Sequence, residues 1–224
     1  MKIKKIWFNE MPKQLEGYAV IIDAYAASAN MAILLSKSPK RLLIVNEDNL
    51  GKARQTYKNT ILIGESDILP NNSFVFTNRL KDMYEGNVVG KNILWMSING
   101  SRVFEKVVAF IAKGDVIAGS LHNSKAVVDY LLAKNAKIVY LVMAGERGLH
   151  VEEDKICADL IEKRLLKKSF NWIRAKKRIS RYVSSLYTPH IYENLPFLLE
   201  HLDEFTLVPK CVKNNKGFLE VRPF

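Results

Sequence analysis

Cysteine is scarce in this sequence, because 224 residues contain only Cys157 and Cys211. Two thiols cannot form a disulfide framework, so we expect a reducing, cytoplasmic environment. Long apolar runs are also missing, since none approaches the roughly 18 residues that a membrane-spanning helix needs. The N-terminus, MKIKKIWFNEMPK, carries lysines without a continuous apolar stretch behind them. We therefore predict an edge strand there rather than a signal peptide, and no membrane contact.

Several familiar catalytic motifs are absent as well. The sequence contains no P-loop, no G-x-G-x-x-G, no nucleophile elbow, no H-E-x-x-H and no cysteine–histidine pair. These absences argue against the commonest nucleotide-binding, α/β-hydrolase and zinc-protease chemistries. There are also no internal repeats and no low-complexity segments. We expect one domain over residues 1–224.

Positive charge is plentiful, with a net charge of +11. Nine of the basic residues fall between Lys163 and Arg181, where Leu165, Phe170 and Ile179 recur at roughly helical spacing. That pattern is typical of a helix with a packed apolar stripe and a solvated basic side. The alternative is a surface for nucleic acid or a membrane, but no zinc-ligand spacing, RNA-binding strand or glycine-clamped loop supports it. We expect neither as a partner.

Short apolar runs alternate with helical patterns along the chain. Strands are predicted at residues 18–24, 41–46, 60–65, 92–98, 115–121 and 137–145. Helices are predicted at residues 28–37, 48–57, 100–112, 123–134 and, as one long helix, from about 152 onward. Apolar runs without alternation suit strands covered on both faces, and their spacing suits right-handed βαβ units. The predicted fold class is therefore α/β, with a mostly parallel sheet in a three-layer α/β/α arrangement.

Two regions depart from this rhythm. The segment 66–91 is rich in proline, asparagine and glycine, and we predict an excursion close to the functional site. After Arg181 we predict a helix around residues 190–202 and two closing strands at 205–209 and 217–222.

Polar residues gather at the ends of the predicted strands. In open α/β sheets, ligands bind outside the carboxyl ends of the strands. Carboxylates there suit a hard cation such as Mg²⁺, and the N–H groups of helix starts suit phosphate. We therefore predict metal-assisted chemistry on a small anionic ligand. The candidate residues are Asp23, Ser28, Glu65, Asn99, Gly100, Ser101, Asn123, Arg147 and Asp154.

Some of these candidates have a simpler explanation. Ser28 and Asn123 are typical helix N-cap residues, and acidic residues such as Asp154 favour the dipole in the first turn of a helix. Asp23 is harder to explain in this way, because it follows four apolar residues at a strand end, where an idle carboxylate costs desolvation energy.

In their order and spacing, the strand ends resemble the 2-phosphosulfolactate phosphatase family. The resemblance runs from about Tyr18 to the C-terminus, over the segments VIIDAYAASA, ILIGES, SINGSR, AGSLHNSKAVVDYL and VMAGERGLHVEEDKICADLI. It implies an α/β/α fold and a Mg²⁺-dependent phosphatase of coenzyme M biosynthesis that acts on a small phosphate monoester.

The resemblance also gives the candidates roles. Asp23, with Glu65 or Asp154, would hold Mg²⁺ and form the catalytic group. The helix starts at 99–101 and Asn123 would hold the phosphoryl oxygens. Either an activated water or Asp23 itself would attack, and the sequence does not choose between them.

The sequence departs from the family pattern at arginines. Ala26 and Ser66 stand where the family has two of them, although a guanidinium is the natural ligand of phosphate and sulfonate oxygens. Arg79 and Arg147 lie in loops where we expect no arginine in the family. We hypothesise that the anion pocket has moved and the substrate has changed. The opposite hypothesis is a catalytically silent, ligand-binding homologue. Oligomeric state, including a homo-oligomer, stays open.

Overall fold

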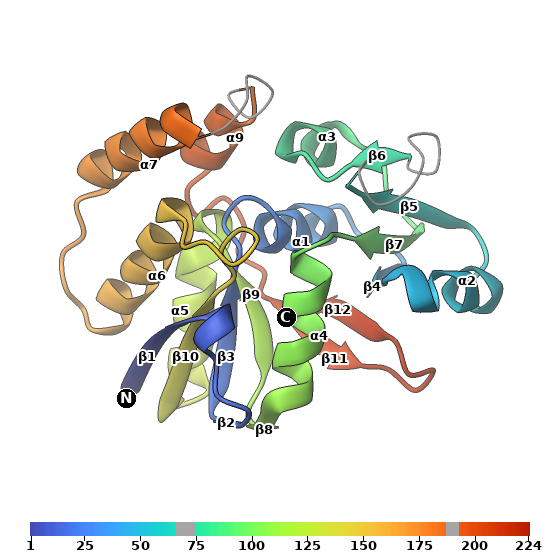
Figure 1. Ribbon diagram of the computed structural model, residues 1–224, viewed down its shortest axis with the longest axis horizontal. Helices are drawn as coiled ribbons and strands as arrows, with labels where there is room; N and C mark the ends of the chain where they lie inside the picture. The colour runs from blue at the N-terminus through green and yellow to red at the C-terminus, as the bar shows by residue number, and fades with distance from the viewer. Residues whose placement is uncertain (66–74, 187–192) are drawn as a thin grey trace.

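One large sheet organises the computed structural model, which describes residues 1–65, 75–186 and 193–224. Figure 1 shows this sheet with helices packed around it. In spatial order its strands are β1 (Lys2–Trp7), β10 (Ile138–Met143), β3 (Tyr18–Ile22), β9 (Val116–Gly119), β11 (Pro209–Lys213), β12 (Leu219–Pro223), β4 (Arg41–Ile44), β7 (Asn92–Met96), β5 (Thr60–Gly64) and β6 (Phe76–Thr77). A separate pair is formed by β2 (Leu15–Glu16) and β8 (Ile111–Lys113).

The sheet consists of two parallel halves joined by an antiparallel hairpin. Strands β1, β10, β3 and β9 run parallel, as do β4, β7, β5 and β6. The C-terminal hairpin β11–β12 pairs antiparallel with β9 on one side and with β4 on the other. The prediction of a mostly parallel sheet is confirmed. The last two strands, however, lie at the centre of the sheet, where Cys211 and Val221 are buried.

The helices connect these strands and give the predicted three-layer α/β/α arrangement (Figure 1). The α-helices are α1 (Ala27–Ser36), α2 (Glu47–Thr56), α3 (Leu80–Glu85), α4 (Gly100–Phe110), α5 (Ser124–Ala133), α6 (Glu152–Leu165), α7 (Trp172–Leu186) and α9 (Leu195–Glu200). Short 3₁₀ turns are η1 (Phe8–Glu10) and η3 (Leu121–Asn123). Within the described ranges, no helix combines the length and apolar character that a bilayer span requires.

Burial follows the sequence pattern strand by strand. In β3 the four residues from Ala19 to Ile22 are fully buried, as expected for a strand covered on both faces. Strand β1 lies at one edge of the sheet, and among the described strands it pairs only with β10, in parallel, with Lys2 opposite Ile138. Its lysines suit an edge, because charged side chains there discourage pairing with another chain. The predicted N-terminal edge strand is confirmed.

The single long helix predicted from residue 152 is wrong, because the structure divides it. Helix α6 ends at Leu165, and Lys167 adopts a left-handed φ of 54°. Lys168 then donates its backbone N–H to the carbonyl of Lys163 at 2.8 Å, which closes the helix end. Asn171 starts α7 by accepting the N–H of Arg174 at 2.9 Å. The basic stretch from 163 to 181 therefore spans two helices and their connection.

The strand predicted at 205–209 is also misplaced. Phe205 donates its N–H to the carbonyl of His122 at 2.9 Å, so this segment runs beside η3 and the strand begins only at Pro209. The helix predicted at 190–202 is shorter, since α9 spans Leu195–Glu200 and 187–192 lie outside the described residues. In the excursion 66–91, residues 66–74 are also outside, and the described part forms β6 and α3.

Candidate functional site

Asp23 lies directly after β3, at the carboxyl end of the sheet, and is buried. Its Oδ1 accepts the backbone N–H of Ala27 at 3.1 Å. Ser28 fixes the turn, because its hydroxyl donates to the carbonyl of Ile21 at 2.9 Å and accepts the N–H of Asp23 at 3.2 Å. The predicted N-cap role of Ser28 is wrong, since α1 begins at Ala27 with Ala26 in the cap position. Ser28 instead orients the strand end that carries Asp23.

Asp154 lies in the first turn of α6 and joins three elements at one point. Its Oδ1 accepts the N–H of Ala24 at 2.7 Å, and its Oδ2 accepts the N–H of Gly145 at 2.9 Å. The side chain is only 2 % exposed. A residue placed there for the helix dipole alone would face solvent. Asp154 instead ties the ends of β3 and β10 to the start of α6.

Glu65 follows β5, in the half of the sheet that also contains β4, β7 and β6, and it contacts the residues after β6 and β7. Its Oε1 accepts the side-chain amide of Asn78 and the backbone N–H of Ile98, each at 3.2 Å, and a short hydrogen bond from the Ser97 hydroxyl. Ser97 in turn accepts the N–H of Gly100 at 3.2 Å, so the start of α4 is fixed by the same cluster. Glu65 therefore links the ends of β5 and β7.

Two asparagines connect the halves. Asn99 donates from its side chain to the carbonyl of Gly145 at 2.6 Å, which joins the start of α4 to the loop after β10. Asn30 of α1 donates to the carbonyl of Asn78 at 2.7 Å. Asp23, Glu65, Asp154 and the 99–101 turn thus meet along one edge of the sheet, as the sequence predicts.

The carboxylates at this edge destabilise one another's ionised forms. Burial is the main cause that raises the pKa of Asp23 to about 7, and the charges of Glu146, Glu65 and Glu153 add to it. The hydrogen bond from the N–H of Ala27 lowers this pKa, but by less. Burial, then the charges of Asp23 and Glu153, hold the pKa of Asp154 well above its ordinary value. A bound cation would relieve this repulsion, because an opposite charge favours the ionised form of a carboxylate.

The oxygen donors at this edge therefore match the chemistry of a hard divalent cation. In the part of the chain that the structure describes, however, no three acidic, histidine or cysteine side chains are grouped so that they could hold a metal ion. The carboxylates are instead engaged with backbone N–H groups and Ser97. Asp23, Glu65 and Asp154 as a Mg²⁺ triad stay a prediction.

The two unexpected arginines lie at the periphery of the cluster. Arg147 is mostly exposed, and its Nε lies 3.4 Å from the carboxylate of Glu146. Arg79 is exposed just before α3. Burial and then the charge of Glu153 raise the pKa of Tyr25, and the charge of Arg79 offsets this only in part. Neither arginine forms an ion pair with Asp23, Glu65 or Asp154 within the described residues.

Gly100 and Ser101 serve packing at the start of α4. A Cβ on Gly100 would lie 2.7 Å from the side chains of Ala27 and Trp95, so only glycine fits between them. The hydroxyl of Ser101 donates to the carbonyl of Val45 and accepts the N–H of Ser97, both at 3.1 Å.

Asn123 is separate from the carboxylate cluster. Its side chain accepts the backbone N–H of Ser120 and donates to the carbonyls of Ala118 and Leu207, so no group is left for a ligand. It occupies the N-cap position of α5, but its side chain does not cap that helix. The ligand role predicted for Asn123 therefore gains no support.

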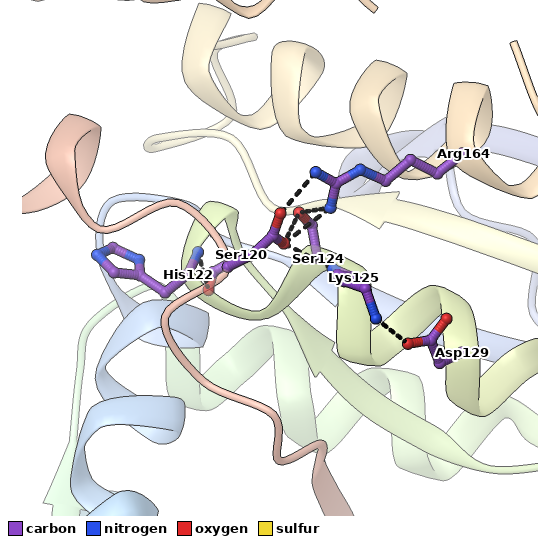
Figure 2. A network of polar contacts seen from close by, with 7 residues as sticks. Ser120, His122, Ser124, Lys125, Asp129 and Arg164 are labelled. Atoms are coloured by element: carbon purple, nitrogen blue, oxygen red, sulfur yellow. Dashed lines mark hydrogen bonds and ion pairs between the residues drawn. The ribbon is translucent and has the colours of Figure 1, made fainter. Parts of the chain in front are cut away.

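A carboxylate of the protein itself occupies the N-terminus of α5. Asp203, which follows α9, accepts the hydroxyl of Ser124 at 2.8 Å and the backbone N–H of Lys125 at 2.7 Å. Arg164 of α6 donates to both oxygens of Asp203, at 2.7 and 2.5 Å, and Figure 2 shows its guanidinium beside Ser124. The helix start that the sequence suggests for phosphate is thus already satisfied.

Sequence reasoning missed Ser97, Asn30 and Tyr25, and it gave no role to Glu146 at the end of the last parallel strand. Ser97 follows the buried strand β7 as Asp23 follows β3, so the same search of strand ends could have found it. Asn30 and Tyr25 carry no such signal, because their positions near the cluster depend on how α1 packs.

Comparison with known proteins agrees with this architecture. The family model described as 2-phosphosulpholactate phosphatase matches residues 7–200, starting before Tyr18 and stopping before the C-terminal hairpin. A protein of Thermotoga maritima is 32 % identical over 148 residues, covering 66 % of this chain and 62 % of the relative. One of Clostridium acetobutylicum is 30 % identical over 145 residues, covering 64 % and 60 %. Both are named probable 2-phosphosulfolactate phosphatase.

The aligned part of the chain spans about three fifths of the length of these relatives. The family model, by contrast, matches most of the chain. On that match, this protein belongs to the 2-phosphosulpholactate phosphatase family.

Proposed function

We propose that this protein is a Mg²⁺-dependent phosphatase that hydrolyses a small phosphate monoester at the carboxyl edge of the sheet. The observation that carries the proposal is the pair of buried carboxylates, Asp23 and Asp154, which lie where β3, β10 and α6 meet. Burial raises the pKa of each, and the charge of Asp23 raises that of Asp154 further. Burial of like charges is costly, and it is typical of sites that bind a cation or move a proton. Membership of a phosphatase family supports the same activity.

Asp23 and either Asp154 or Glu65 would hold the metal. The bound Mg²⁺ would stabilise charge on the phosphoryl oxygens and activate a water molecule. The N–H groups of Ala24 and Gly145 keep Asp154 in place, and Ser97 does the same for Glu65. Asp23 would either attack the phosphorus atom or take the proton of the attacking water. In the first case the bond from phosphorus to the ester oxygen breaks, the alcohol leaves, and water then hydrolyses the aspartyl phosphate; in the second, water displaces the alcohol directly.

The first turn of α4 would contact the phosphoryl oxygens, because Asn99 and Gly100 lie within the cluster. Arg79 and Arg147 would then approach the ligand from the periphery. This relocation fits Ala26, a short side chain three residues after Asp23, where the family resemblance implies arginine. We propose that the substrate accordingly differs from 2-phosphosulfolactate.

A silent ligand-binding homologue is the second candidate function. It is favoured by the absence, among the described residues, of a ready group of three metal ligands. It would bind phosphate-bearing molecules at the same edge without turning them over.

A phosphatase screen separates the two functions. The purified protein is assayed over small phosphate esters with and without Mg²⁺, alongside Asp23→Asn. We expect Mg²⁺-dependent release of phosphate that the variant loses. Phosphate binding without any turnover would favour the silent homologue, and neither binding nor turnover would refute both.

Separate Arg79→Ala and Arg147→Ala variants test the relocated anion pocket. We expect at least one of them to weaken the binding of phosphate-bearing ligands severalfold. Unchanged affinity in both variants would refute the relocation while leaving the carboxylate site untouched.

A further inference from the structure

A cavity lies beside the carboxylate cluster, at the ends of β1 and β10. Its volume is about 250 Å³. Three ring side chains from different elements line it: Trp7 at the end of β1, His150 just before α6, and Tyr182 of α7. The rings of Trp7 and His150 are stacked, with their centroids 4.0 Å apart and their planes 7° from parallel.

The cavity is one strand away from Asp23. Trp7 pairs with Met143 of β10, and Met143 pairs with Ile22, the residue before Asp23. Val151 and Glu152, which line the cavity, directly precede Glu153 and Asp154. Burial raises the pKa of Tyr182, and the charges of Glu153, Glu152 and Asp154 raise it further, so the carboxylates act on the cavity wall. The cavity and the carboxylate cluster are therefore adjacent, and the consecutive residues 151–154 join them.

Most charges around the cavity are already paired within the protein. Lys5 contacts Asp159 at 2.8 Å and Glu162 at 2.7 Å, and Arg178 is paired with Glu152. The lining that remains is mainly aromatic and aliphatic, with Met143 and Val151 beside the rings, and it also includes the exposed Lys155. Its aromatic and aliphatic part suits a flat, uncharged group.

The volume also limits the ligand. Pockets for drug-sized ligands run from roughly 300 to 1,000 Å³, so this cavity accepts a single ring rather than a dinucleotide.

We propose that this cavity binds a flat aromatic ring in the organic part of the phosphate ester. The inference rests on the proposed function, and it names the substrate class: a phosphate monoester whose alcohol carries one aromatic ring. The rings of Trp7 and His150 would provide the stacking surface, while the phosphate lies at the carboxylate edge.

The test compares phenyl phosphate, propyl phosphate and inorganic phosphate by isothermal titration calorimetry with Ca²⁺ in place of Mg²⁺, and released phosphate is assayed to verify that no ester is hydrolysed during the titration. A single aromatic contact contributes about 2- to 10-fold in affinity, so we expect phenyl phosphate to bind that much more tightly than propyl phosphate. Trp7→Ala should bring the two esters to equal affinity. His150→Ala, a change at an exposed residue, should reduce the preference without the risk of unfolding an edge strand.

Trp172→Ala is the matched control, because Trp172, at the start of α7, lines a different cavity and not this one. It should leave the preference for phenyl phosphate unchanged. Equal binding of the two esters to the wild type, or an unchanged preference in both Trp7→Ala and His150→Ala, would overturn the ring site alone. Failure of all three probes to bind would overturn the proposed function together with the ring site.

Discussion

The carboxylate of Asp203 offers the sharpest test of how the fold is held together. It receives two hydrogen bonds from Arg164, one from the Ser124 hydroxyl and one from the N–H of Lys125. It therefore caps α5, pairs with α6 and fixes the chain after α9 at once. We predict that Asp203→Ala lowers the free energy of unfolding well beyond the effect of an ordinary surface substitution.

The magnitude follows from the contacts. Loss of a helix cap costs about 1 kcal/mol. Hydrogen bonds to a charged partner contribute about 1.5–3 kcal/mol, and solvent screening is limited here because the side chains of Asp203 and Arg164 are only 19 % and 27 % exposed. The expected loss is about 2–4 kcal/mol. For a chain of this size it corresponds to a fall in Tm of about 5–15 °C.

Urea unfolding of the wild type, Asp203→Ala and Asp129→Ala measures this difference. Asp129 is the matched control because it contacts Lys125 at 2.8 Å from a side chain that is 60 % exposed. Its pair should contribute no more than about 0.5 kcal/mol. A loss in Asp203→Ala as small as that in Asp129→Ala would refute the reasoning.

The pH dependence provides a second readout. Burial raises the pKa of Asp203, but the bonds from Arg164, Ser124 and Lys125 outweigh it and lower the pKa below the ordinary 3.8. A lowered pKa means that the stabilisation is fully present at neutral pH and disappears as the pH falls through the folded-state value. The stability difference between the wild type and Asp203→Asn should therefore shrink only below about pH 4.

Three further substitutions test the site. Burial, above all, raises the pKa of Asp23 to about 7, so ionisation of Asp23 destabilises the fold as the pH rises from about 4 to 7. In urea unfolding with a chelator present, the free energy of unfolding should therefore fall less between pH 5 and pH 8 for Asp23→Asn than for the wild type. Equal falls would contradict this. Ser97→Ala removes the hydroxyl that holds Glu65 and should weaken Mg²⁺ binding, measured by calorimetry. Ser97→Thr keeps a hydroxyl and should bind Mg²⁺ as the wild type does. Equal Mg²⁺ affinities in all three proteins would count against Ser97 as the residue that positions Glu65. Gly100→Ala places a methyl group 2.7 Å from neighbouring side chains and should cost about 1–3 kcal/mol in thermal unfolding, while Gly51→Ala, with open space around it, should not destabilise the protein.

Local patterns in the sequence were enough to predict most of the sheet. Unalternating apolar runs such as YAVII mark strands covered on both faces, and the lysines of KIKKIW mark an edge. These features depend only on the burial of each residue, which a short window of sequence records. The same reasoning placed Asp23 at a strand end, because a carboxylate after four apolar residues needs a local explanation.

Helix ends were less readable. The break after Leu165 depends on a left-handed Lys167 and on Asn171 as a cap, and neither interrupts the helical spacing of apolar residues. Similarly, Phe205 and Leu207 suggest a strand, although their segment lies beside η3. Periodicity reports that a side chain is buried, but not which element buries it.

The sequence by itself therefore determined the fold class, the N-terminal edge strand and the position of Asp23 at a strand end. Only the tertiary structure decided that the C-terminal hairpin joins the two parallel halves, that Asp203 fills the helix start beside Asn123, and that Asp154 accepts N–H groups after both β3 and β10. The physical reason is that each of these contacts joins residues far apart in the chain. Their distances depend on strand order and register, which no local pattern of burial or charge records.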